Sequence, residues 1–157
     1  MSILLLAECW PYRNLAGSFD TSQSRLLAHT CGLTIQHLQS LCCCDYVIDN
    51  YIPSYKRDKH YEVLLRAKMN SGIIDRIMQH DITILIGKRL MQVMSRSHVE
   101  FCKEYFTYCL DKPYQIEMTV ACIPNPMAEF WWKESTNLIK VFDFMHHVFK
   151  VYGNGTF

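Results

Sequence analysis

Residues 3–27 read ILLLAECWPYRNLAGSFDTSQSRLL, and the expected fold depends on this stretch. The four apolar residues from Ile3 to Leu6 are too few to span a membrane and are typical of a buried strand. Glu8 follows, and Pro11 turns the chain before a helical pattern begins near Asp20. A strand that leads directly to a carboxylate predicts a ligand site, because ligands of open α/β sheets bind at the carboxyl ends of the strands.

The remaining sequence alternates between helical and strand patterns. Helices are expected at residues 20–32, 34–41, 61–80, 88–94, 97–110 and 135–152, and further strands at 46–48, 82–86 and 116–123. Asn70-Ser71-Gly72 forms a weak point within the helix at 61–80. This alternation predicts an α/β fold, a three-layer α/β/α sandwich with a mainly parallel central sheet of four strands.

Composition places the chain among single globular domains. Its 157 residues are 50% hydrophobic and 20% charged, so one domain spanning residues 1–157 is expected. The net charge of +1 excludes an overall cationic field of the kind that drives non-specific nucleic-acid binding, although Lys88 and Arg89 could form a local basic patch.

The cysteines favour a reducing compartment. No charged leader with a cleavable apolar core precedes the domain, so we expect a cytoplasmic, intracellular location and no membrane partner. The eight cysteines then act mostly as small buried hydrophobic residues. Cys42-Cys43-Cys44 lacks the C-x-x-C spacing of metal sites, and we expect neither a metal nor a cofactor.

Three polar residues, Glu8, Asn50 and Asn125, each follow a predicted strand directly. Parallel strands present their carboxyl ends at one edge, so these side chains could share a crevice, with Phe19 on the loop that returns from the first strand. An acid, two amides and an aromatic ring suit a flat heterocycle. Structural roles stay open: Asn50 as a turn former before Pro53, Phe19 in the core, and Asn125 as part of a rigid loop.

The same residues carry a resemblance to a known family. The motifs are Ala7-Glu8-Cys9-Trp10-Pro11, Gly17-Ser18-Phe19 with Ser22 to Leu27, Asp49-Asn50-Tyr51-Ile52-Pro53, Ile84-Leu85-Ile86-Gly87-Lys88, and Pro124-Asn125-Pro126-Met127 with Trp131-Trp132. From Leu4 to about Leu138 their order resembles that of the uracil-DNA glycosylase superfamily, especially its branches with G-E-x-P-G and H-P-S motifs.

The resemblance implies hydrolysis of the N-glycosidic bond of uracil or another modified base in DNA. Glu8 would position or activate water, Phe19 would stack on the extruded base, and Asn50 would read its edge. Asn125 lies in the loop that steadies the departing base. Candidate DNA contacts are Lys88, Arg89, Trp131 and Trp132, and the expected partner is DNA that contains a modified or deaminated base.

The chain departs from the family pattern at several positions. Ala7 replaces the first glycine of motif one, Pro11 or Tyr12 replaces the second, and Asn125 stands where the family usually has histidine. The paired cysteines that hold a cluster in some branches are also missing. A catalytically reduced relative that binds nucleic acid or a protein partner is therefore an alternative hypothesis, and a hydrolase of free nucleosides or nucleotides is another.

Overall fold

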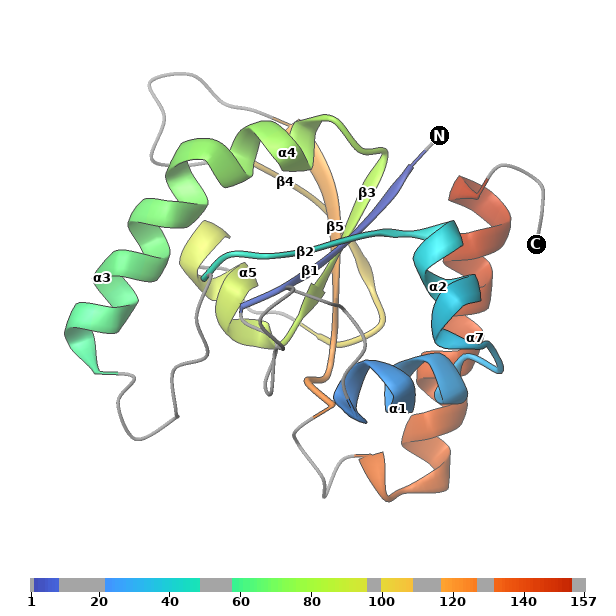
Figure 1. The fold of residues 1–157 in the computed structure, drawn as a ribbon. Helices are drawn as coiled ribbons and strands as arrows, with labels where there is room; N and C mark the ends of the chain where they lie inside the picture. Colours follow the sequence, from blue (N-terminus) through green and yellow to red (C-terminus); the bar gives the residue numbers. More distant parts are fainter. Residues whose placement is uncertain are drawn as a thin grey trace.

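The computed structural model describes residues 2–8, 22–48, 58–95, 100–108, 117–126 and 132–153. Within these residues one sheet of five strands has the order β2-β1-β3-β5-β4 (Figure 1). The strands are β1 (Ile3–Ala7), β2 (Cys43–Tyr46), β3 (Ile82–Ile86), β4 (Glu104–Tyr108) and β5 (Glu117–Ile123). The first three and β5 are parallel, whereas β4 runs antiparallel to β5.

Helices pack against both faces of the sheet. They are α1 (Ser22–Thr30), α2 (Ile35–Leu41), α3 (Lys59–Lys68), the π-helical segment η2 (Met69–Ile73), α4 (Ile74–Met78), α5 (Lys88–Ser95) and α7 (Ser135–Tyr152). Figure 1 shows α3, α4 and α5 on one side of the sheet and α1, α2 and α7 on the other. None of the helices in the described ranges is long and apolar enough to cross a lipid bilayer.

Strand β1 is buried on both faces because its side chains alternate between two hydrophobic clusters. Leu4 and Leu6 pack in the cluster that contains α3, η2, α4 and α5. Ile3 and Leu5 pack in the cluster that contains α1, α2 and α7. This arrangement explains why β1 is a continuous apolar run rather than an alternating one.

Local sequence signals set several helix boundaries, as expected. Gly32 adopts φ +72 just after α1, a conformation that favours glycine. The Thr34 side chain caps α2 by accepting a hydrogen bond from the His37 N–H. The expected weak point in the helix at 61–80 is confirmed: η2 separates α3 from α4, and Ser71 within it has non-helical backbone angles.

Two sequence predictions are wrong. The helix expected at 97–110 is replaced by β4, so the sheet has five strands instead of four. β4 satisfies backbone groups along the edge of β5, with Tyr105 paired to Val120, and this pairing overrides local propensity. The strand expected at 46–48 is instead Cys43–Tyr46, because its register is set by pairing with β1 and not by its β-branched residues.

Candidate functional site

The order of strands changes direction between β1 and β3. From β1 the chain passes to β2 on one side and then crosses to β3 on the other. In open α/β sheets the crevice at such a switch point, outside the carboxyl ends of the strands, is the usual ligand site. The residues placed at this edge are Glu8 after β1, the start of α5 after β3, and Asn125 after β5.

Backbone hydrogen bonds hold Glu8 at this edge. The Ile48 N–H donates to the Glu8 carbonyl at 2.8 Å, so the pairing between β1 and β2 continues past both strands. On the other side of β1, the Gly87 N–H donates to the Ile123 carbonyl at 2.8 Å and joins the ends of β3 and β5. The four parallel strands β1, β2, β3 and β5 therefore have their carboxyl ends at the same edge as Glu8.

The carboxylate of Glu8 is buried beside a cation. Glu8 is 7% exposed, and its Oε1 lies 3.6 Å from Nε of Arg89 in α5. This separation exceeds that of a good hydrogen bond, so the contact is an ion pair. The Arg89 side chain is 41% exposed. Its Nη1 is nevertheless buried and has no hydrogen-bond partner among the described residues.

Tyr61 supports the guanidinium of Arg89 from α3. The guanidinium carbon lies 6.0 Å from the centre of the Tyr61 ring, within the range of a cation–π contact. Asp58 fixes the start of this helix by accepting a hydrogen bond from the Tyr61 N–H at 3.1 Å. Helix α3, through Tyr61, thus positions the cation that faces Glu8.

Asn125 lies at the same edge in a loop that a tryptophan anchors. The indole N–H of Trp132 donates to the Asn125 carbonyl at 2.7 Å, and Trp132 is buried in the cluster under α7. The main chain of Asn125 is therefore fixed while its side chain is half-buried. Neighbouring strands lie about 4.8 Å apart. Because β3 lies between β1 and β5, Glu8 and Asn125 follow strands roughly 10 Å apart.

The expected DNA contacts have specific surroundings. Lys88 places its Nζ 4.7 Å from the centre of the Phe101 ring, and it diverges from Arg89, which faces Glu8. Trp132 is only 4% exposed, so its ring packs in the core instead of facing a partner. Phe19, Asn50 and Trp131 lie outside the described residues, and their expected roles stay predictions.

No protein-family model and no curated protein matches this chain. The resemblance to the uracil-DNA glycosylase superfamily therefore rests on the order of the motifs alone.

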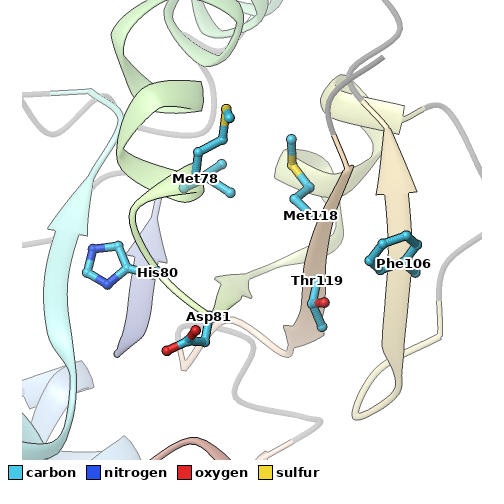
Figure 2. Close-up of a pocket in the computed structure, with 7 residues that line it drawn as sticks. Met78, His80, Asp81, Phe106, Met118 and Thr119 are labelled. Atoms are coloured by element: carbon cyan, nitrogen blue, oxygen red, sulfur yellow. The ribbon is translucent and has the colours of Figure 1, made fainter. Parts of the chain in front are cut away.

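A hollow of about 350 Å³ lies at the opposite edge of the sheet, at the amino ends of β3 and β5. Figure 2 shows the side chains that line it, with Met78 and Met118 on either side and Asp81 and Thr119 at one end. A five-residue strand is about 16 Å long, so this hollow lies roughly one strand length from the edge that carries Glu8. Its size alone does not make it the stronger candidate site, because the buried acid and the carboxyl ends of the parallel strands lie elsewhere.

The buried cysteines among the described residues behave as structural thiols. Burial raises the pKa of Cys31 and Cys122 from 9.0 to about 12, which disfavours the thiolate needed for nucleophilic attack or metal binding. Cys43 is exposed. Among the described residues no group of three or more histidine, cysteine, aspartate or glutamate side chains could hold a metal ion.

Sequence reasoning missed two participants at this edge. Arg89 was expected to contact DNA, and its ion pair with Glu8 was not predicted. Tyr61 was part of the helical pattern at 61–80, and nothing in the sequence links it to Arg89. Only the packing of α3 against α5 brings the two together. The available signal was Asp58, a residue type that caps helices, and it indicates where the helix starts but not which residue Tyr61 contacts.

Proposed function

We propose that this protein is a DNA-glycosylase-like hydrolase that cleaves the N-glycosidic bond of uracil or another modified base in DNA. The observation that carries the proposal is the buried carboxylate of Glu8 at the end of the central strand, beside the switch point of the sheet. We take the fold to be a three-layer α/β/α sandwich, since hydrophobic clusters lie on both faces of the sheet.

In the proposed reaction the bond between the sugar C1′ and the base nitrogen breaks, and water supplies the hydroxyl group at C1′. Glu8 orients that water or stabilises the positive charge that develops on the sugar, an interaction strengthened by its low exposure. The amide of Asn125, which follows β5 at the same edge, would donate to the departing base, which leaves with the electron pair and then takes a proton. Phe19 and Asn50 would hold the extruded base.

A second candidate is a glycosylase-like protein that binds nucleic acid or a protein partner without turnover. It is favoured by the position of Arg89, whose Nε lies 3.6 Å from Glu8 Oε1. In this arrangement the guanidinium competes with water and with the sugar for that oxygen. Catalysis would require Arg89 to move or to act together with the carboxylate, whereas binding alone would not.

The test measures release of a base from oligonucleotides that contain uracil, hydroxymethyluracil or another altered base. Release is detected by cleaving the strand at the abasic product. Wild type is expected to release at least one of them, and Glu8→Gln should be slower by about 10²–10⁴-fold, as for loss of a positioned acid or base. Glu134→Gln, an exposed acid before α7, is the matched control and should behave as wild type.

Two outcomes decide between the candidates. Equal release by wild type and Glu8→Gln would remove the catalytic role of this carboxylate. Binding of DNA by wild type without any abasic product, at every base tested, would favour the second candidate over the first. A further comparison uses Asn125→Ala, which keeps the backbone carbonyl that Trp132 binds and should slow release.

A further inference from the structure

A hollow of about 210 Å³ lies beside the π-helical segment η2. Its walls come from the end of β2 and from the α3–η2–α4 helix, and they consist of Tyr46, Val47, Lys68, Ser71, Gly72, Ile73 and Arg76. The hollow forms where Ser71 departs from helical backbone angles. A π-turn inside a helix is frequently found at functional sites.

The charged residues that line this hollow are both cationic. Lys68 is exposed, and the Arg76 side chain is 51% exposed, so both can reach a ligand. Arg76 is oriented by an ion pair with Asp45, which uses only part of the five donors of a guanidinium. Of the described residues that line the hollow, none is acidic.

The hollow lies one strand away from Glu8. Tyr46, at its wall, is paired in register with Ala7, the residue before Glu8. Neighbouring strands are about 4.8 Å apart, so an anion held here would lie within reach of a ligand whose other part occupies the switch point. There is open space around Gly72, where an added Cβ atom would meet nothing within 4 Å.

We propose that this hollow, between Lys68 and Arg76, is a binding site for a phosphate group, supplied by the phosphodiester backbone of a nucleic acid. Arginine forms paired hydrogen bonds with phosphate oxygens, and lysine adds a compact charge. The choice of nucleic acid as the source of the phosphate rests on the proposed function. The expectation that the hollow binds phosphate rests only on its cationic side chains. A small phosphorylated ligand would use the same groups.

The test measures binding of a fluorescent oligonucleotide with only standard bases, at several salt concentrations and with inorganic phosphate as competitor. Gly72→Asp places a carboxylate in the hollow and should weaken binding at least tenfold (about 1.4 kcal/mol), as repulsion replaces attraction. Gly72→Ala is the matched steric control, because its added Cβ meets no atom within 4 Å and carries no charge. Lys68→Gln should weaken binding. It should also reduce, by about 1, the slope of the logarithm of the binding constant against the logarithm of the salt concentration.

Lys150→Gln in α7, which packs on the opposite face of the sheet, controls for a general loss of positive charge. Phosphate displacing the probe at concentrations similar to those of oligonucleotide phosphate would identify a small phosphorylated ligand. Much tighter oligonucleotide binding would identify a nucleic acid. Both results support the site.

The proposal is overturned if wild type does not bind the oligonucleotide at low salt. It is also overturned if Gly72→Asp and Lys68→Gln both bind as tightly as Gly72→Ala. Because this assay uses no modified base, its result is independent of base release. If oligonucleotide binding depends on Lys68 but no base is released from any modified oligonucleotide, the phosphate site is supported and the catalytic proposal is removed.

Discussion

Arg89 in α5 holds its Nε 3.6 Å from Oε1 of Glu8, which links the end of β1 to the helix that follows β3. Because Glu8 is 7% exposed, the ion pair is screened by solvent mainly on the arginine side, where the side chain is 41% exposed. The contact thus spans the switch point of the sheet, and it affects both stability and the proposed chemistry.

Arg89→Met should lower the free energy of unfolding by about 1–2 kcal/mol, because it leaves the buried carboxylate without this cation. The measurement is urea unfolding of Arg89→Met, Glu8→Gln and the double variant. We expect the arginine substitution to cost less in the Glu8→Gln background. Lys150→Met, on an exposed face of α7, should change stability little. Equal costs in both backgrounds would show that the pair contributes nothing.

Gly87→Ala should destabilise the fold by about 1–2 kcal/mol, because Gly87 adopts φ +96 between β3 and α5. No atom lies within 4 Å of the Cβ that the substitution adds, so the cost comes from the backbone alone. Gly72→Ala is the control, with equally open surroundings but no positive φ, and it should be neutral or slightly stabilising. Thermal unfolding that ranks the two variants in the reverse order would contradict this account.

Thr83→Val should raise the free energy of unfolding by about 1 kcal/mol. Thr83 is fully buried in β3, and its hydroxyl has no hydrogen-bond partner among the described residues. Replacing the hydroxyl by a methyl group removes the cost of burying it and keeps the shape of the side chain. Thr83→Ser retains the hydroxyl and loses a methyl group, so it should destabilise. A less stable valine variant in urea unfolding would indicate a partner for this hydroxyl.

Stability should fall as the pH rises above about 9. Burial raises the pKa of the Cys31 and Cys122 thiols from 9.0 to about 12, so the folded chain keeps protons that the unfolded chain loses. Unfolding then releases protons, and each thiol reduces the free energy of unfolding by up to about 1.4 kcal/mol per pH unit between these values. Urea midpoints measured with reductant at pH 7, 8.5 and 9.5 check this.

Cys31→Val should show a shallower fall, because it removes one of the buried thiols. A midpoint that stays constant from pH 8 to 10 in wild type would contradict the linkage. Alkylation at neutral pH, mapped by peptide mass spectrometry, gives an independent check. Among the described thiols, exposed Cys43 should react well before buried Cys31 and Cys122.

Predictions from the sequence succeeded where neighbouring residues decide the structure. The apolar run at 82–86 forms β3, and the amphipathic pattern at 135–152 forms α7 with the expected bounds. The prediction for 97–110 was wrong because β4 depends on the edge of β5, a partner that periodicity cannot identify.

Local sequence was enough to predict a buried strand just before Glu8, a helix capped by Thr34 and an interruption of the helix at 61–80 near Ser71. These features follow from hydrophobic runs and capping groups within a few residues of one another. The ion pair of Arg89 with Glu8 and the position of Arg76 beside the end of β2 were visible only after folding. Such contacts join segments distant in the chain, so they depend on the order and register of the strands, which no local pattern specifies.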